Sequence, residues 1–302
     1  MSEPSEIEAL VAQIEAAGWP EGLDAERAAM EAEAPPVADD IRIEPITLAG
    51  RPAEILSAPD VSRNGVALYL HGGGYVYGSL SSHRGLVGEI ARATGLPVVQ
   101  LDYRLAPEHP HPAALIDAVA AVEALYDDGL DPHELVLIGD SAGGGLVVAT
   151  LLALRDAGLP MPRAAVCLSP WTDLTCSGES YATRGALDPM IDRSLTLKLA
   201  ELYGPHATKR EPAISPLFGD LEGLPPLLVQ VGEREVLYSD AEGLAERARR
   251  AGVPVTFEAW PEMIHVWHLY FPQLAKACEA IDRIGRFVAA SLALPNEREP
   301  AQ

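Results

Sequence analysis

Short runs of apolar residues alternate with longer amphipathic stretches from residue 41 onward. The runs have the length of buried strands, whereas the longer stretches repeat apolar positions every three or four residues, as helices do. The predicted strands are 66–70, 98–101, 135–138, 164–168, 227–231 and 255–259, and the predicted helices are 82–93, 113–126, 142–157, 241–251 and 274–292. This alternation predicts an α/β fold whose mostly parallel sheet is covered by helices on both faces.

Other segments do not follow this alternation of strand and helix patterns. Residues 1 to about 34 show helical spacing, and Gly18-Trp19-Pro20 divides them into two short predicted helices. Segments 41–48 and 53–57 are predicted to add antiparallel edge strands. Residues 175–215 follow a strand but contain irregular helical pieces such as 193–203. We interpret this stretch as an insertion that folds back with the N-terminal helices as a lid.

The composition limits the classes of binding partner and the cellular compartment that we expect for this protein. The 302 residues are 48% hydrophobic, and 44 acidic residues against 22 basic ones give a formal charge of −22. Such an excess repels nucleic acid and anionic membranes. The three cysteines are too few and too scattered for a disulfide framework or a metal site, so they predict free, mostly buried thiols. The N-terminus is acidic and no apolar run approaches the roughly 18 residues of a membrane span, which predicts a cytoplasmic protein without stable membrane association.

A serine lies in the tight turn Gly139-Asp140-Ser141-Ala142-Gly143. The turn joins a predicted buried strand to a predicted helix of small and aliphatic residues. A serine in such a strained turn exposes its hydroxyl above the sheet, and the N-terminus of the next helix faces the same point. A glycine-rich packing turn with an incidental serine is the alternative. The flanking strand and helix favour Ser141 as a nucleophile, with the N–H of Ala142 as a donor to an oxyanion.

A second glycine turn, His71-Gly72-Gly73-Gly74-Tyr75, directly follows the strand 66–70. Successive glycines leave backbone N–H groups free to approach a ligand, and this HGGG pattern supplies oxyanion donors in lipases and esterases. A flexible linker is the alternative, but a linker would not follow a buried strand so abruptly. Gly73 and Gly74 are the preferred donors and Gly72 is a third candidate, while His71 is interpreted as structural.

These two motifs resemble the bacterial hormone-sensitive-lipase-like (family IV) esterases of the α/β-hydrolase superfamily, in the branch with a GDSAG nucleophile turn. The segments 102–108 (Asp-Tyr-Arg-Leu-Ala-Pro-Glu) and 169–174 (Ser-Pro-Trp-Thr-Asp-Leu) add to the resemblance, which covers roughly residues 40 to 290. It implies an eight-stranded, mostly parallel sheet, a helical cap and hydrolysis of carboxylic esters. It also implies that Asp102 and Arg104 form a buried pair that fixes a loop, and it allows a homodimer through the last strand and last helix.

With this resemblance the chain divides into four segments. Residues 1–40 would form the N-terminal cap helices and residues 175–215 the cap insertion. Residues 41–174 and 216–302 would form the first and second parts of the catalytic domain.

The base is predicted from chain order, since this fold places nucleophile, acid and histidine in that sequence. The family's motif puts the base on His265, with His268 as a neighbour. His109 and His111 lie in a proline-rich loop without a third metal ligand. The polar contexts of the remaining candidates predict exposed side chains; these are His83, His133 and His206.

The acid must follow a strand and reach the ring nitrogen of the base that faces away from the serine. Family members usually carry Asp-Pro-Leu after this strand, whereas this chain has Glu235-Val236-Leu237. Glu235 therefore takes the acid position, which the fold accepts as Asp or Glu. Asp240 is the alternative, although it is better placed to cap the following helix. Glu233 is expected to be solvated.

Together these residues predict a carboxylesterase that uses a Ser141-His265-Glu235 triad and an acyl-enzyme intermediate, without a metal or an organic cofactor. Its partner would be a small-molecule ester with a short or medium acyl chain. Tyr75, Tyr77 and Trp171 are candidates for the substrate pocket. An amidase or another acyl hydrolase could use the same triad. A non-catalytic receptor on this scaffold would be expected to lack the serine or the histidine, and both are present.

Overall fold

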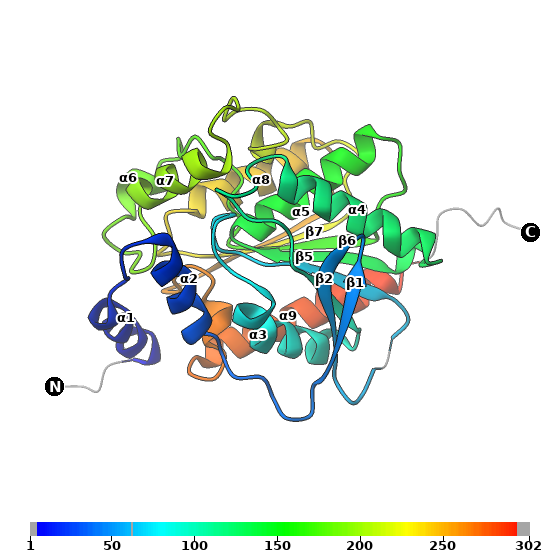
Figure 1. Ribbon diagram of the computed structural model, residues 1–302, viewed down its shortest axis with the longest axis horizontal. Coiled ribbons are helices and arrows are strands. Elements are labelled where there is room, and N and C mark those ends of the chain that lie inside the picture. The colour runs from blue at the N-terminus through cyan, green and yellow to red at the C-terminus, as the bar shows by residue number, and fades with distance from the viewer. Residues whose placement is uncertain (1–4, 62, 295–302) are drawn as a thin grey trace, which may run out of the picture.

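The computed structural model describes residues 5–61 and 63–294, which form one eight-stranded sheet with helices on both faces (Figure 1). The strand order is β1-β2-β4-β3-β5-β6-β7-β8. The strands are β1 (Arg42–Leu48), β2 (Arg51–Ser57), β3 (Val66–Leu70), β4 (Val98–Leu101), β5 (Leu135–Asp140), β6 (Ala164–Leu168), β7 (Leu227–Gly232) and β8 (Val255–Trp260). The pairs β1–β2 and β2–β4 are antiparallel. All other neighbouring strands, from β4 to β8 in the strand order, pair in parallel.

Helices cover both faces of the sheet: α3 and α9 pack together on one face, and α4, α5 and α8 lie on the other (Figure 1). The α-helices are α1 (Glu6–Ala17), α2 (Leu23–Ala32), α3 (Leu80–Thr94), α4 (Ala113–Asp127), α5 (Ala142–Asp156), α6 (Ser180–Thr183), α7 (Arg193–Tyr203), α8 (Tyr238–Arg250) and α9 (Ala275–Leu292). Short 3₁₀ helices are η1 (Pro132–Glu134), η2 (Pro216–Phe218) and η3 (Trp267–Tyr270). None of the helices within the described ranges is long and apolar enough to cross a membrane.

The predicted strands and helices are confirmed, including the antiparallel strands at the start of the sheet. The strand bounds differ by at most two residues: β2 begins two residues earlier than predicted, at Arg51, and β5 extends two residues beyond its apolar run, to Asp140. All six residues of β5 and of β7 are buried, which explains why both strands are mostly apolar rather than alternating, although Gln230 interrupts β7 and Asp140 ends β5. Of the three free cysteines, Cys167 and Cys176 are buried and Cys278 is exposed, as expected for structural thiols.

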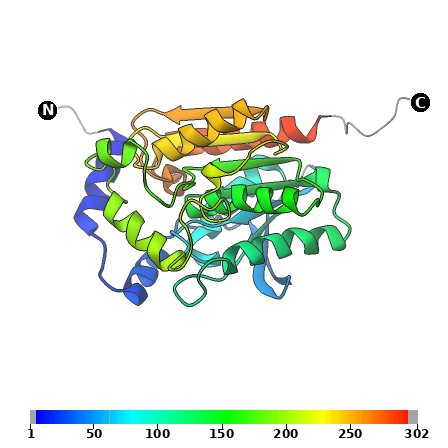
Figure 2. The same cartoon turned by 90° about the horizontal axis from the view of Figure 1, so that it is seen from above.

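The parallel strands bring their carboxyl ends to one edge of the sheet. The glycine turn follows β3, Ser141 follows β5, and Ser169 follows β6. Loops at this edge are where open α/β sheets bind ligands. Helices α1, α2, α6 and α7 gather at one side of the molecule in both views (Figures 1 and 2).

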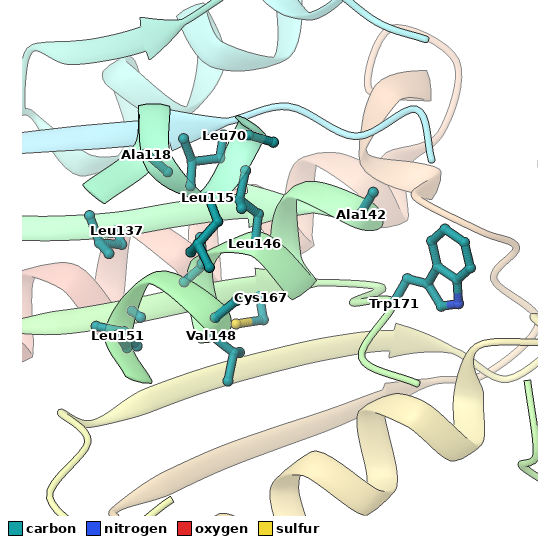
Figure 3. Close-up of a cluster of buried hydrophobic side chains, with 14 of the residues drawn as sticks. Leu70, Leu115, Ala118, Leu137, Ala142, Leu146, Val148, Leu151, Cys167 and Trp171 are labelled. Atoms are coloured by element: carbon teal, nitrogen blue, oxygen red, sulfur yellow. The ribbon is translucent and has the colours of Figure 1, made fainter. Parts of the chain in front are cut away.

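The helix after Ser141 is held by a dense apolar core. Leu146, Val148 and Leu151 of α5 belong to the buried cluster that also contains Leu137 of β5 and Cys167 of β6 (Figure 3). Ala142 and Trp171 lie at the end of this cluster away from Leu151. Burying each such side chain contributes about 1.5–3 kcal/mol, so the core fixes the position and direction of the helix that begins at the serine.

The expectation for Asp102 and Arg104 is wrong, because Arg104 pairs with another carboxylate. Its guanidinium and its backbone N–H both donate to Asp117 of α4, with Nη2 2.7 Å from Oδ1. The backbone carbonyl of Asp102 instead accepts from Arg51. Asp117 lies across from the loop only in the folded chain, so the neighbouring Asp102 was the nearer choice in sequence.

Candidate active site

Ser141 lies in a strained turn between β5 and α5. Its φ is 52°, in the left-handed region that side chains rarely adopt. The turn leaves no room for larger neighbours: a Cβ on Gly143 would overlap the carbonyl oxygen of Leu70. The Ser141 N–H donates to the Leu168 carbonyl (2.8 Å), which ties the turn to β6. The hydroxyl is thereby held at the N-terminus of α5, as the motif predicts.

The structure brings His265 and Glu235 to this serine. His265 Nε2 lies 2.9 Å from Ser141 Oγ, and His265 Nδ1 lies 2.9 Å from Glu235 Oε2. An ionised carboxylate only accepts hydrogen bonds, so Nδ1 carries the ring proton of the neutral imidazole. Nε2 is then free to accept the proton of the serine hydroxyl. Residues 124 positions apart thus form one continuous hydrogen-bonded chain.

Glu235 is fully buried, and its second oxygen is satisfied by two further donors. Oε1 accepts from Ser169 Oγ (2.7 Å) and from the Gly232 N–H (2.6 Å). Ser169 Oγ in turn accepts from the Val266 N–H (3.1 Å), directly after His265. Ser169 therefore joins the loops of the acid and the base. This role was not predicted from the sequence, although a polar residue immediately after a buried strand is a signal that could have indicated it.

Electrostatics favour a charged ring during reaction. Burial by itself would lower the pKa of His265, but the hydrogen bond and charge of Glu235 outweigh it, and the charges of Asp188 and Asp140 add to the rise. Burial raises the pKa of Glu235, while His265, Ser169 and the Gly232 N–H stabilise its charged form and oppose that rise. The site is thus arranged to hold an imidazolium next to a carboxylate.

Asp240, the alternative acid, lies elsewhere. Its Oδ2 accepts from the backbone N–H groups of Thr172 (2.9 Å) and Asp173 (2.7 Å). It is not a helix cap either, because α8 begins after Leu237 and the Asp240 side chain is buried beneath the segment 172–173. Burial raises the pKa of Asp240 well above its usual range. This carboxylate holds the loop after β6 in place.

A buried polar network holds the glycine turn against β5. Asp140 Oδ1 accepts from Tyr69 Oη (2.7 Å) and from the Gly72 N–H (2.9 Å), so Gly72 is not available as an oxyanion donor. His83 was expected to be exposed but is fully buried, because its Nε2 faces Asp140 Oδ2 at 3.4 Å. Burial lowers the pKa of His71 to about 3, and its neutral ring stacks on Tyr103. This agrees with a structural interpretation of His71.

The backbone N–H groups of Gly73 and Gly74 find no hydrogen-bond acceptor among the described residues. Gly73 has a φ of 104°, and a Cβ there would overlap the Tyr77 carbonyl, so only glycine fits. Both glycines line the same cavity as Ser141. Ala142 is the first residue of α5, where backbone N–H groups lack partners within the helix.

A cavity of about 820 Å³ opens above Ser141 and His265. Its walls come from parts of the N-terminal segment 13–36, from residues 189–191, 195, 196 and 199 of the insertion, and from parts of the loop 265–273. Tyr77 and Trp171 line it, as predicted. Tyr75 does not: its ring is buried and stacks on Tyr203 with centroids 3.8 Å apart. Tyr75 follows the glycine turn directly and has a left-handed φ of 64°, which the sequence could not reveal.

An eight-stranded, mostly parallel sheet with a serine in the turn after a central strand defines an α/β hydrolase, and a family model described as "alpha/beta hydrolase fold" matches residues 67–269. An acetyl-hydrolase from Streptomyces hygroscopicus is 52% identical over 221 residues, which are 73% of this chain and 74% of the relative. An esterase from Acinetobacter venetianus is 36% identical over 252 residues, 83% and 82% of the two chains.

Solved structures with a similar fold are also esterases. An esterase/lipase from an uncultured bacterium superposes with a TM-score of 0.94 at 46% identity, over 97% of this chain and 100% of that one. An esterase from the bacterial hormone-sensitive lipase family superposes with a TM-score of 0.93 at 45% identity, with the same coverage. This chain therefore belongs to the bacterial hormone-sensitive-lipase-like (family IV) esterases, and it is a carboxylic ester hydrolase.

Proposed function

We propose that this protein hydrolyses small carboxylic esters through Ser141, His265 and Glu235 by way of an acyl-enzyme. The observation that carries the proposal is the unbroken chain from Ser141 Oγ through both nitrogens of His265 to Glu235, with 2.9 Å at each contact. Nucleophile, base and orienting acid within hydrogen-bond reach of one another are the requirement for covalent acyl transfer.

In the first half of the reaction, His265 Nε2 accepts the proton of Ser141 as the serine oxygen attacks the ester carbonyl. The carbonyl π electrons move to its oxygen, which we propose is held by the N–H groups of Gly73, Gly74 and Ala142. Losing one such donor typically costs about 2.7–4 kcal/mol of transition-state stabilisation. The tetrahedral intermediate then collapses, the C–O bond to the alcohol breaks, and the imidazolium donates its proton to the leaving oxygen.

In the second half, water takes the place of the alcohol. His265 accepts a proton from this water, and the resulting oxygen nucleophile attacks the acyl-serine. Collapse of the second intermediate releases the carboxylic acid and returns the proton to Ser141 Oγ. Throughout both halves Glu235 keeps the ring proton on Nδ1 and stabilises the imidazolium.

The substrate is inferred from the cavity and from the relatives. We propose that residues 1–40 and 175–215 act as a cap over the catalytic domain, because segments of both line the cavity. A cavity of about 820 Å³ is in the usual range for a small-molecule pocket, and it must hold both the acyl group and the alcohol. Relatives include an acetyl-hydrolase and an ethyl acetate hydrolase. These features support esters with short or medium acyl chains.

This preference predicts a maximum in a series of p-nitrophenyl esters from acetate to palmitate. We expect kcat/KM to rise towards butyrate or hexanoate, since each methylene that fits contributes up to about 0.8 kcal/mol. It should fall at least about tenfold by the twelve-carbon chain, where the acyl group outgrows the enclosed space. Initial rates of p-nitrophenol release, measured below the critical micelle concentration of each ester, test this. A maximum at twelve carbons or beyond would contradict the short- to medium-chain assignment.

A further inference from the structure

Helix α6 and the stretch between α6 and α7 lie directly against the loop that carries Glu235. Ser180 Oγ donates to the Val236 carbonyl and accepts from the Ser239 N–H (3.0 Å). The Arg184 guanidinium covers the Tyr238 ring, 3.6 Å from its centroid, and donates to the Glu233 carbonyl. The insertion and the acid loop therefore form one packed unit at the edge of the site.

Asp188 is the buried carboxylate at this contact, with 8% of its surface exposed. Its Oδ2 accepts from the N–H of Val236 (3.0 Å), the residue after Glu235. Its Oδ1 accepts from the N–H groups of Met190 (3.0 Å) and Ile191 (3.2 Å), which line the cavity. One side chain thus holds both the acid loop and the cavity wall.

Three backbone donors on one carboxylate explain why an acidic side chain occupies this buried place. A buried charge is costly unless it is paired or hydrogen-bonded, and here both oxygens are satisfied. The contacts to Met190 and Ile191 are local, whereas Val236 lies 48 residues from Asp188 in sequence. The contact therefore couples the geometry of the acid to the shape of the cavity.

We propose that Asp188 is a positioning residue of the hydrolytic site, which holds the Glu235 loop and the cavity wall in register. The inference rests on the proposed roles of Ser141, His265 and Glu235. Asp188 touches neither the serine nor the substrate carbonyl in this mechanism, so it acts through its neighbours.

The charged groups around His265 set the sign of the electrostatic effect. Burial lowers the pKa of His265, while Glu235 from the loop after β7, Asp188 from the insertion and Asp140 at the end of β5 each raise it. Removing the charge of Asp188 should therefore lower the pKa of His265. Because the base must be neutral in the free enzyme, the acidic limb of the kcat/KM profile should move to lower pH.

The test is Asp188→Asn in the full-length protein, assayed with p-nitrophenyl butyrate from pH 4 to 9. The amide keeps the size of the side chain but places an NH₂ group against one set of backbone donors. We expect kcat at the optimum to fall by about 10- to 100-fold, as for small misplacements of a catalytic group. We also expect the acidic limb to move to lower pH. A purely structural role would leave that limb unchanged.

Two further variants make the result unambiguous. Asp192→Asn is the matched control, because Asp192 is exposed, caps α7 and is replaced by an equally good cap, so kcat and the pH profile should not change. Asp188→Glu keeps the charge but lengthens the side chain by one methylene and so displaces the carboxylate from its backbone donors; kcat should therefore fall while the acidic limb stays in place. Circular dichroism checks that each variant is folded; if one is not, the other decides.

Unchanged kcat in a folded Asp188→Asn or Asp188→Glu variant would overturn the inference, as would an unmoved acidic limb in Asp188→Asn. Failure of the proposed function has a different signature, since wild-type hydrolysis would then survive Ser141→Ala. Ser141-dependent hydrolysis with an unaffected Asp188→Asn would remove only the inference about Asp188.

Discussion

Replacing Ser141 by alanine should reduce kcat for p-nitrophenyl butyrate by about 10⁴-fold or more, because the covalent route disappears entirely. The residual rate would come from binding and from the backbone donors of Gly73, Gly74 and Ala142, which the substitution leaves in place. KM should change little, since the hydroxyl contributes to bond formation rather than to ground-state binding. The measurement is steady-state kinetics on protein purified from a host without background esterase activity.

Ser81→Ala is the matched control for this substitution. Ser81 is exposed in the first turn of α3, and its loss should leave kcat within twofold of the wild type. The strained φ of 52° at position 141 remains with alanine, so the fold should be retained. A folded Ser141→Ala variant with more than a tenth of the wild-type kcat would rule out Ser141 as the nucleophile.

Replacing Glu235 by glutamine should reduce kcat by about 10³- to 10⁴-fold. The carboxylate accepts from His265 on one oxygen and from Ser169 and Gly232 on the other. An amide has only one oxygen, so its NH₂ group must face one of these donors. If it faces His265, Nδ1 becomes an acceptor, the proton moves to Nε2, and the ring can no longer accept the proton of Ser141.

Two further variants distinguish a specific role of Glu235 from a nonspecific disturbance of the structure. Glu233→Gln makes the same change two residues away on an exposed side chain and should leave kcat unchanged. Glu235→Asp keeps the charge but shortens the side chain by one methylene, so we expect a smaller loss of about 10- to 100-fold. Near-wild-type kcat in folded Glu235→Gln would remove Glu235 from the triad.

The sheet could be predicted because its central strands are buried on both faces. β5 begins with the apolar run 135–138, β7 is apolar apart from Gln230, and helices such as α9 show their periodicity plainly. Ser141 could be identified from the sequence for a similar reason, since a strand, a glycine-flanked serine and a helix are all local features. Local features do not identify His265 and Glu235. Chain order reduces the number of candidate acids and bases, and the resemblance to a family indicates which positions they take.

The contacts that complete the site could not be predicted from local sequence patterns, because they join residues that are distant in sequence. Ser169 meets Glu235 across 66 residues, and Asp140 meets the Gly72 N–H across 68. Tyr75 stacks on Tyr203 and does not line the cavity, and its left-handed φ of 64° is a backbone conformation that no local pattern indicates. Arg104 selects Asp117 rather than its neighbour Asp102 for the same reason: the packing of α4 decides which carboxylate is within reach.

The central claim is that Ser141 forms the covalent intermediate, and a trapped adduct tests it most directly. Diethyl p-nitrophenyl phosphate phosphorylates an activated serine and releases p-nitrophenol, giving an adduct that hydrolyses slowly. We predict one phosphoryl group per chain by intact-mass spectrometry, its location on Ser141 by peptide mapping, and loss of esterase activity in proportion to labelling. Complete inactivation with the label on another residue, or full activity in protein fully labelled at Ser141, would contradict the claim.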